Sequence, residues 1–387
     1  MIERHVRSLI LSRLGSYPAV VLVGPRQSGK TTLARSLTTR SYDLEQEADR
    51  LRLDVEWEEC VARPSAGEGA APIVLDEAQT WPAIFPRLRG AIDADRRRTG
   101  RFLLLGSVSP PLMHEVAESL AGRLSVVELT PILATEVPQV DLDDLWLRGG
   151  FPDGGVIQPA MFPQWQRDYV ALLTQRDLPN WGLPAKPKVT ERLLRMLAAV
   201  HGQIWNASQV ASSLGVSYAT VNTYLDYLEG AFLIRRLQPY FANLGKRLTK
   251  SPKVYWRDPG LLHAVLQTTT RDDLLARPWV GASWEGFVIE QVLGLLSARG
   301  EAFEPYFLRT SDRYEIDLVL FFRGEIWAIE VKLTSSPGTE DFDRLDKAAG
   351  FIGAKRRVLI SRVREAAESG DRLSCSLGHF LGVLAGL

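Results

Sequence analysis

The stretch that decides the fold of the first third of the chain is Ala19-Val20-Val21-Leu22-Val23 followed by Gly24-Pro25-Arg26-Gln27-Ser28-Gly29-Lys30-Thr31. Five apolar residues in a row are typical of a buried parallel strand, and a helix is expected to begin at Lys30. The spacing G-x-x-x-x-G-K-[ST] between them is that of a phosphate-binding loop in its required context. Its glycines allow successive backbone N–H groups to face phosphate oxygens at the start of the helix.

This loop predicts a bound nucleotide with its metal ion. We expect Lys30 to reach the β- and γ-phosphates and the Thr31 hydroxyl to ligate Mg²⁺. The residues predicted to bind the nucleotide are Gly24, Pro25, Arg26, Gln27, Ser28, Gly29, Lys30, Thr31 and Thr32.

Polar residues with catalytic potential follow two further apolar runs. Asp76 ends the run 73–75, where it would hold the metal, and Glu77 after it would act as general base for the attacking water. An acidic strand end beside a turn is the alternative for a lone Asp-Glu pair, but the glycine-rich loop favours the metal interpretation. Ser107 follows the run 102–105 and is predicted near the γ-phosphate, although Gly-Ser is also a common turn. Arg123 is either an arginine finger, from the same or a neighbouring subunit of an oligomer, or a solvated structural residue.

The order of apolar and helical segments predicts an α/β protein of several domains. Runs at 19–23, 42–44, 73–75, 102–105 and 126–129 alternate with helical stretches, which indicates a parallel sheet with helices on both faces. Beyond residue 280 the pattern predicts helix 284–298, strands 303–308, 314–322 and 325–333, helix 340–351 and strand 357–361. The predicted domains are 1–155 with the phosphate-binding loop, 156–265 mainly helical, and 266–387 small α/β.

Composition excludes several classes of protein. The 387 residues are 24% charged and 45% hydrophobic, which excludes disorder, collagen-like repeats and a disulfide scaffold. Two cysteines and five scattered histidines argue against a zinc site and favour a reducing, cytoplasmic setting. The first ten residues have helical rather than signal-peptide spacing, and no run of 18 apolar residues predicts a membrane span.

The net charge of zero is a cancellation between unlike segments. Residues 1–150 hold 18 basic and 21 acidic side chains, 160–260 hold 13 and 6, and 261–387 hold 15 and 18. The middle segment is therefore basic, and a basic segment favours contact with nucleic acid.

Within the basic segment lies a helix-turn-helix pattern. Residues 207–217 predict a short helix, a glycine turn and a serine N-cap, and 218–228 predict a second helix with Val221, Leu225 and Leu228 on one face. The strand expected at 232–237 resembles the first wing of a winged helix. The second helix has no Lys or Arg, so we expect phosphate contact through basic residues that follow it. These are Arg235, Arg236, Lys246, Arg247, Lys250 and Lys253. A structural or protein-docking winged helix is the alternative.

A cluster of carboxylates and a lysine is predicted near the C-terminus. Two adjacent strands can bring Asp317, Glu330 and Lys332 together, because side chains alternate between the faces of a strand. Two carboxylates hold Mg²⁺ or Mn²⁺, and a nearby lysine orients water, in phosphodiester hydrolysis. Glu285 or Glu290 would complete the metal shell. A structural ion pair of Lys332 with Glu330 or Asp317 has the same appearance in sequence.

The chain resembles a bacterial and archaeal family of P-loop ATP-binding proteins that join an AAA-type ATPase domain to a C-terminal domain of uncharacterised function with a PD-(D/E)xK, restriction-endonuclease-like core. The matching segments are Gly24 to Thr32, Leu75-Asp76-Glu77-Ala78-Gln79, Leu105-Gly106-Ser107, Ser119-Leu120-Ala121-Gly122-Arg123, Gly149-Gly150-Phe151-Pro152, Arg176-Asp177-Leu178, Glu315-Ile316-Asp317 and Ile329-Glu330-Val331-Lys332, with Glu285 at the family's helix glutamate. Ala78 stands where the family usually has Ile.

The resemblance implies a RecA/AAA-like P-loop sheet and a small α/β, restriction-endonuclease-like domain, and the helix-turn-helix pattern predicts a winged-helix unit between them. It implies ATP and Mg²⁺ at Lys30 and Thr31, and metal and water at Asp76 and Glu77. It places Ser107 at the polar sensor and Arg123 at the characteristic arginine of the family's pattern. We therefore expect a Mg²⁺-dependent ATPase whose nucleotide state controls engagement of DNA or a protein partner, with a second Mg²⁺ or Mn²⁺ at Glu285, Asp317 and Glu330. The alternative is a nucleotide-gated protein-interaction or signalling module without nuclease activity.

Overall fold

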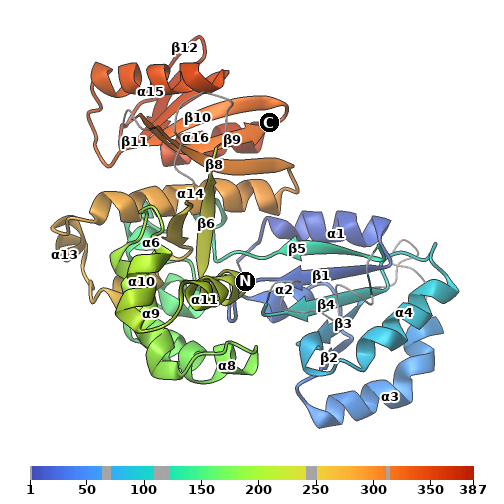
Figure 1. Cartoon of the computed structure of the whole chain (residues 1–387). Helices are drawn as coiled ribbons and strands as arrows, with labels where there is room; N and C mark the ends of the chain where they lie inside the picture. The colour runs from blue at the N-terminus through green and yellow to red at the C-terminus, as the bar shows by residue number, and fades with distance from the viewer. Residues whose placement is uncertain (1, 63–70, 109–119, 121, 241–250, 311–313) are drawn as a thin grey trace. The chain divides into compact units, whose positions relative to one another are not determined.

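A computed structural model describes residues 2–62, 71–108, 120, 122–240, 251–310 and 314–387. These residues divide into two compact units (Figure 1). Unit 1 comprises Met1–Ile132 with the short segments Gly230–Phe232 and Ala298–Gly300. Unit 2 comprises the remainder of the described chain.

Unit 1 is built on a parallel sheet of five strands in the order β2-β3-β4-β1-β5. Its elements are α1 (Val6–Ser16), β1 (Ala19–Val23), α2 (Lys30–Arg35), β2 (Ser41–Asp43), α3 (Glu47–Ala62), β3 (Ile73–Asp76), η2 (Ala78–Thr80), α4 (Ile84–Ala94), β4 (Phe102–Gly106) and β5 (Leu124–Glu128). The parallel sheet expected from the apolar runs is confirmed.

Helices cover both faces of the sheet in unit 1. Val6, Ile10 and Leu14 of α1 share one apolar cluster with Leu33 of α2 and with alternate residues of the strands. On the other face Trp57 of α3 stacks on Phe102, with ring centroids 6.4 Å apart. Every residue of β1 is buried, as a continuous apolar strand between two covered faces requires.

The strand order places the predicted site residues at one edge of the sheet. β1 lies between β4 and β5, and β3 lies next to β4. Because parallel strands end at the same edge, the residues that follow β1, β3 and β4 are neighbours in space. The loop after Val23, the Asp76–Glu77 pair and Ser107 are therefore brought together by topology.

Unit 2 contains a helical part and a second sheet. Its elements are η4 (Ala134–Glu136), α6 (Leu142–Arg148), η5 (Pro152–Val156), η6 (Pro159–Met161), α7 (Gln164–Leu172), η7 (Leu173–Asp177), α8 (Leu178–Asn180), α9 (Pro187–Ala199), α10 (Ala207–Leu214), α11 (Tyr218–Gly230), β6 (Ile234–Pro239), β7 (Lys253–Trp256), α12 (Pro259–Val265), α13 (Arg271–Leu275), α14 (Val280–Ala298), β8 (Phe303–Arg309), β9 (Glu315–Phe322), β10 (Glu325–Val331), α15 (Thr339–Ile352), β11 (Arg356–Ser361), β12 (Ala367–Ser369), β13 (Arg372–Ser376) and α16 (Leu377–Gly386). Strands β12 and β13 and helix α16 were not predicted from the sequence.

The sheet of unit 2 joins segments that the sequence assigns to two domains. Its order is β12-β13-β11-β10-β9-β8-β6-β7, so the β6–β7 hairpin continues the sheet formed by β8 to β13. Leu345, Ala348 and Ile352 of α15 pack on Ile316 and Val319 of β9. The predicted division at residue 265 runs through this one sheet, and the three-domain division stays a prediction.

A buried carboxylate fixes the turn that follows α6. Asp258 accepts hydrogen bonds from the backbone N–H groups of Gly150, at 2.7 Å, and Leu261, at 2.9 Å. Gly149 has φ of +81°, and a Cβ atom there would lie 2.2 Å from Asp258 Oδ1. The glycine at position 149 is therefore explained by its packing against Asp258, the N-cap of α12.

Helix α14 is the longest apolar helix of unit 2, with Val288, Ile289, Val292 and Leu296 almost fully buried. Across the described residues, no helix is both long enough and apolar enough to cross a membrane.

Candidate functional site

The predicted phosphate-binding loop leaves β1 at Val23 and enters α2 at Lys30. Gly24 has φ of +154°, and a Cβ atom on it would lie 2.2 Å from the carbonyl oxygen of Leu129, so only glycine fits there. Gly29 has φ of +98°, in the left-handed region that glycine adopts without strain. The two glycines of the motif therefore serve the backbone path of the loop.

Lys30 is directed back onto its own loop. Its ammonium donates hydrogen bonds to the carbonyl oxygens of Gly24 and Pro25, both at 2.9 Å. Burial lowers the pKa of Lys30 to about 8, against the opposing attraction of Glu77 and Asp76. A polyanion at the loop would give this buried ammonium a stronger partner than two neutral carbonyl groups.

Thr31 and Asp76 meet as the motif predicts for metal ligands. The Thr31 hydroxyl donates to Asp76 Oδ2 at 2.6 Å, and Asp76 Oδ1 accepts from the Glu77 N–H at 3.0 Å. Burial raises the pKa of Asp76, although the Thr31 bond opposes the shift. Hydroxyl and carboxylate oxygens are the donors that Mg²⁺ prefers, so the residues fit this ion.

Glu77 is held in a strained backbone position beside Ser107. Its φ is +48°, which is uncommon for a residue with a side chain. Ser107 Oγ donates to Glu77 Oε1 at 2.8 Å, and the Gln79 amide donates to Glu77 Oε2. The structure thus brings Thr31, Asp76, Glu77 and Ser107 into one hydrogen-bonded group.

Arg4 supports the loop and was not predicted from the sequence. Its guanidinium donates to the carbonyl oxygens of Ser28, at 3.0 Å, and Thr130, at 2.6 Å. The side chain is buried, and it connects the phosphate-binding loop to the segment that follows β5. No pattern in the sequence marks an arginine whose partners are 24 and 126 residues away.

Arg123, the predicted arginine finger, forms an ion pair within unit 1. Its Nε and one terminal nitrogen both lie 2.9 Å from the Asp93 carboxylate, on α4. The Arg123 hydrogen bond is the main cause that lowers the pKa of Asp93 to about 2. A role in catalysis for Arg123 stays a prediction. In the matching segment around it, Ser119 and Ala121 lie outside the described residues.

The predicted C-terminal residues also come together, around a lysine that the metal hypothesis did not include. Lys253 Nζ lies 2.9 Å from Glu285 Oε1, 2.7 Å from Glu315 Oε1 and 3.8 Å from Asp317 Oδ1. Glu330 Oε1 accepts from Lys332 at 2.5 Å. We call Glu285, Glu315, Asp317 and Glu330 the carboxylate cluster.

Burial and crowding govern the ionisation of the carboxylate cluster. Burial raises the pKa of Asp317 well above its usual value, and the nearby charges of Glu285 and Glu330 act in the same direction. Burial also raises the pKa of Glu330, although Lys332 opposes it. For Lys253, burial is outweighed by Glu285 and its neighbours, so its pKa is raised and it stays an ammonium. Glu290, the alternative metal ligand, instead pairs with Arg235 and Arg257.

In the part of the chain that the structure describes, no group of three or more His, Cys, Asp or Glu side chains is arranged to hold a metal ion. For the carboxylate cluster this agrees with the position of Lys253 between its members. The fit of Thr31 and Asp76 to Mg²⁺ is of a different kind, since bound phosphates supply the remaining ligands of such an ion.

Comparison with known proteins places this chain in a family. Uncharacterised proteins Rv2008c of Mycobacterium tuberculosis and Mb2031c of Mycobacterium bovis are each 39% identical over 345 residues, which is 87% of this chain and 75% of theirs. The chain belongs to the family of these two proteins. Family models match residues 16–137 as an AAA domain, 139–272 as a domain of unknown function (DUF8612) and 280–379 as a domain of unknown function (DUF4143). The first third of this family member is therefore an AAA-type P-loop ATPase domain.

The solved structures that match this chain do so at low sequence identity and with TM-scores below 0.5. The Walker-type ATPase PABY2304 of Pyrococcus abyssi is 14% identical, covers 69% of this chain and 96% of its own, and has a TM-score of 0.47. The RuvB Holliday junction branch migration motor of Thermotoga maritima is 18% identical, covers 60% and 88%, and has a TM-score of 0.27.

The helix-turn-helix pattern of this family member forms the expected helices α10 and α11. Gly215 joins them with φ of +69°, and the Ser217 hydroxyl accepts from the Thr220 N–H at 3.0 Å. Val221, Leu225 and Leu228 are fully buried, as predicted. The two helices therefore form on the predicted apolar face, and the winged-helix identity stays a prediction.

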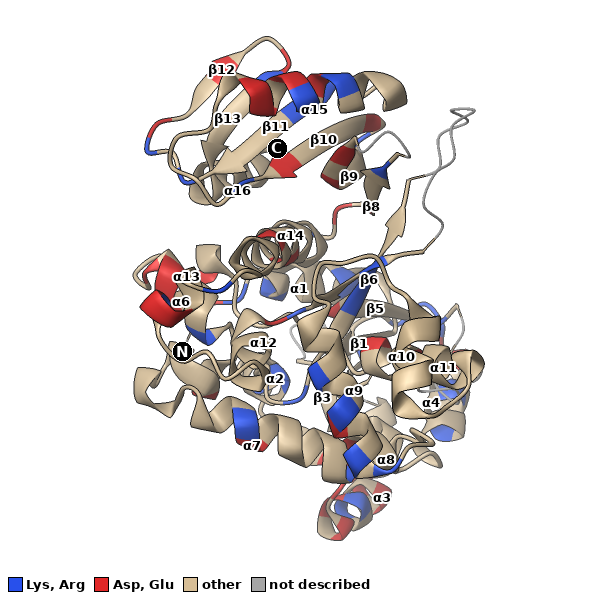
Figure 2. Ribbon diagram, turned by 60° about the vertical axis from the view of Figure 1, so that its left-hand side comes forward, with Lys and Arg blue, Asp and Glu red and all other residues tan. Residues whose placement is uncertain are grey.

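Several predicted nucleic-acid contacts are instead engaged within unit 2. Figure 2 shows Lys and Arg residues on α7, α9 and β6. On β6, Arg235 pairs with Glu290, and Arg236 pairs with Glu229 and, at 2.8 Å, with Asp226. Lys253 is buried in the carboxylate cluster and does not serve as a surface phosphate contact. Lys246, Arg247 and Lys250 lie outside the described residues.

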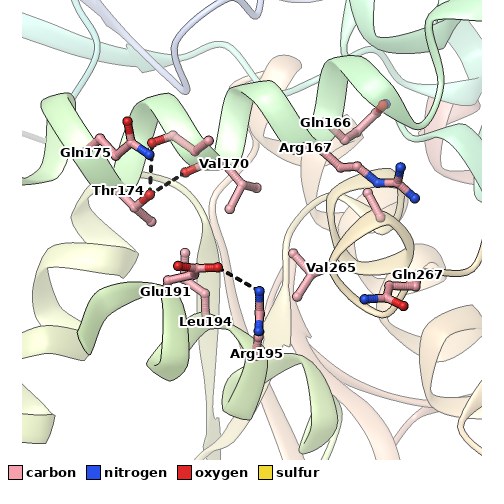
Figure 3. A pocket seen from close by; sticks show the side chains of 12 residues that line it. Gln166, Arg167, Val170, Thr174, Gln175, Glu191, Leu194, Arg195, Val265 and Gln267 are labelled. Atoms are coloured by element: carbon pink, nitrogen blue, oxygen red, sulfur yellow. Dashed lines mark hydrogen bonds and ion pairs between the residues drawn. The ribbon is translucent and has the colours of Figure 1, made fainter. Parts of the chain in front are cut away.

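A separate cavity of about 500 Å³ lies among helices of unit 2 (Figure 3). Leu194 and Val265 contribute apolar surface, and polar groups surround them. Glu191 and Arg195 of α9 form an ion pair at 2.7 Å on one wall, with Arg167 of α7 on another. The residues that line this cavity include none of the predicted site residues.

Proposed function

We propose that this chain binds ATP with Mg²⁺ at residues 24–32 and hydrolyses it. The observation that carries the proposal is the group of hydrogen bonds from Thr31 through Asp76 and Glu77 to Ser107, at the end of three adjacent parallel strands. Bound Mg²⁺ would neutralise phosphate charge in the transition state. The match of residues 16–137 to an AAA domain supports the same activity.

The side chains have separate tasks in this proposal. Lys30 exchanges two carbonyl acceptors for phosphate oxygens, and Thr31 and Asp76 hold the metal. Glu77 accepts the proton of the attacking water while the bond from the γ-phosphorus to its bridging oxygen breaks, which yields ADP and phosphate. Ser107 keeps the Glu77 carboxylate at the edge of the sheet where the γ-phosphate would lie. Arg123 would have to leave Asp93 to act as an arginine finger.

The test separates ATP binding from hydrolysis. We expect Glu77→Gln to keep ATP affinity and lower turnover at least about a hundredfold, because the amide cannot accept a proton. Lys30→Ala is expected to weaken binding and abolish turnover. Lys188→Ala, at an exposed position of α9, is the matched control and should retain full activity. Unchanged turnover in both site variants would show that the activity resides elsewhere or in a contaminant.

We propose further that the nucleotide state controls engagement of a partner by unit 2. The ion pairs of Arg235, Arg236 and Lys253 favour a protein partner over DNA, since three of the six residues predicted to contact phosphate already balance carboxylates of their own unit. Cleavage of nucleic acid is not part of this proposal.

Contact with DNA would depend on Lys246 and Arg247, and this alternative has its own test. ATP turnover is measured with and without double-stranded DNA. Low salt is used because phosphate-driven binding is strongest there. Stimulation that is lost in Lys246→Glu/Arg247→Glu would identify DNA as the partner. Absence of stimulation at low salt would leave a protein as the partner class. Lys186→Glu/Lys188→Glu, at exposed positions, controls for the change in net charge.

A further inference from the structure

Strand β7 places two polar side chains on one face of the sheet in unit 2. Lys253 and Tyr255 are two residues apart, so both side chains leave the strand on the same side. Each donates a hydrogen bond to Glu285 Oε1 of α14. Lys253 and Tyr255 are 3% and 0% exposed, so both bonds are shielded from water.

Lys253 is tied to the carboxylate cluster by more than one partner. Its Nζ also lies 2.7 Å from Glu315 Oε1 and 3.8 Å from Asp317 Oδ1, both on β9. The ammonium lies 5.6 Å from the ring centre of Phe307, a distance at which an aromatic ring attracts a cation. Withdrawing this ammonium would take the counterion from the buried Asp317 and the partly buried Glu285, which is strongly unfavourable.

The carboxylate cluster does not fit a divalent metal in this arrangement. Mg²⁺ requires close to six oxygen ligands at about 2.0–2.1 Å, and Mn²⁺ favours the same kind of ligand. Glu285 Oε1 accepts from Lys253 and Tyr255, Glu330 Oε1 from Lys332, and Asp317 Oδ2 from the Val331 N–H at 2.9 Å. Among the described residues, Glu330 Oε2 is a buried oxygen of this cluster without a hydrogen-bond partner. One such oxygen does not make a metal site.

We propose that Lys253 is the resident cation of the carboxylate cluster and takes the position that a divalent metal ion would need. The wild-type chain then holds no Mg²⁺ or Mn²⁺ between Glu285, Asp317 and Glu330, and unit 2 carries out no metal-dependent phosphodiester cleavage there. This inference is independent of the proposed ATPase activity, which uses residues of unit 1.

The proposal predicts that removing the lysine charge converts the cluster into a metal site. Lys253→Met leaves the carboxylates in place without their counterion, so the variant should be less stable in EDTA and should bind one Mn²⁺. We expect a rise in Tm of at least about 5 °C at Mn²⁺ concentrations a hundredfold above the Kd. Lys253→Arg keeps a cation and should bind no Mn²⁺ at the cluster.

The experiment uses the full chain without nucleotide, in an Asp76→Asn background that removes the metal ligand of unit 1. Mn²⁺ binding is measured by electron paramagnetic resonance, and Tm is measured in EDTA and in Mn²⁺. Lys253→Met/Asp317→Asn should lose the gained site. Lys347→Met, at an exposed position of α15, is the matched control and should behave like the parent protein.

Two results would overturn the proposal. One is Mn²⁺ binding by the Lys253-containing protein that disappears in Asp317→Asn, because the lysine would then be displaced by metal. The other is a folded Lys253→Met variant that binds no Mn²⁺. If Lys253→Met fails to fold even with Mn²⁺ present, the comparison of the Lys253-containing protein with Asp317→Asn still decides whether metal enters the cluster.

Discussion

At the scale of single residues, both oxygens of the Glu77 carboxylate are engaged, by Ser107 and by Gln79. Each carboxylate oxygen can still accept a bond from water, but the bond donated by Gln79 stabilises the charged carboxylate and makes it a weaker base, so this bond holds back turnover. We expect Gln79→Ala to raise kcat about threefold to tenfold, in line with about 1 kcal/mol for one hydrogen bond, with ATP affinity unchanged. Steady-state hydrolysis and titration with a fluorescent ATP analogue measure the two quantities. Gln139→Ala, at an exposed position, is the control, and lower turnover in Gln79→Ala would contradict the prediction.

Arg4 supports the phosphate-binding loop through hydrogen bonds to backbone carbonyl oxygens. Arg4→Ala removes the side chain that donates to the carbonyl oxygens of Ser28 and Thr130. Both oxygens are then buried without this donor. Because an unsatisfied buried carbonyl is costly, we expect the free energy of unfolding of unit 1 to fall by about 2–4 kcal/mol. ATP affinity should weaken about tenfold, since Ser28 lies in the loop. Arg7→Ala, at an exposed position of α1, should change neither quantity in urea unfolding and nucleotide titration. Equal effects of the two substitutions would argue against the positioning role of Arg4.

At the scale of elements, the turn after α6 depends on the absence of a side chain at Gly149. A Cβ atom there would lie 2.2 Å from Asp258 Oδ1, and the backbone has φ of +81°. Gly149→Ala should therefore lower the free energy of unfolding of unit 2 by about 2–4 kcal/mol, through strain and displacement of the N-cap of α12. Gly350→Ala, in α15 with no atom within 4 Å of the added Cβ, should instead stabilise by about 0.5–1 kcal/mol. Urea unfolding of both variants measures the contrast, and equal stability of Gly149→Ala and the parent would exclude the clash.

Elements and local motifs were predictable where the deciding interactions lie close in the sequence. The apolar runs predicted β1 over 19–23 and nearly the full extent of β3 and β4. The short, half-polar strands β12 and β13 lack such runs and were missed. Thr31, Asp76 and Ser107 were predictable because parallel strands bring their ends together. Lys253 was assigned to phosphate contact, because nothing local reveals that Glu285 and Glu315, 32 and 62 residues away, neutralise it.

At the scale of the whole molecule, the basic segment 160–260 has less available charge than its composition suggests. Arg235, Arg236, Lys253 and Arg257 all pair with carboxylates of unit 2, and for all of them but Arg236 the partner lies beyond residue 260. The excess of acidic residues in 261–387 is therefore partly the counterpart of the basic segment. Part of the cancellation that gives a net charge of zero therefore takes place between paired side chains of unit 2.

The pH dependence of stability follows from buried groups of unit 2. His263 Nδ1–H donates to the Leu147 carbonyl oxygen at 2.8 Å, and Nε2 lies 2.7 Å from the Ser283 hydroxyl, which donates to Nε2 when the ring is neutral. Burial lowers the pKa of His263 to about 4, against about 6.5 in the unfolded chain. Because the pKa is lower in the folded chain, the contribution of the neutral His263 ring to stability is complete above pH 6.5. This contribution is lost as the pH falls toward 4.

His263→Gln removes this contribution and keeps a polar side chain of similar length. The quantity to compare is the slope of the free energy of unfolding against pH between pH 4.5 and pH 6. We expect this slope to be smaller in the variant than in the parent protein by about 1.4 kcal/mol per pH unit. Asp258, whose pKa burial raises to about 6, contributes with the opposite sign in both proteins and cancels in the comparison. Urea unfolding at four pH values measures the slopes, with His379→Gln, at an exposed position of α16, as the matched control. Identical slopes for His263→Gln and the parent would mean that His263 takes up its proton in the folded state, and that the hydrogen bond from Ser283 does not keep the ring neutral.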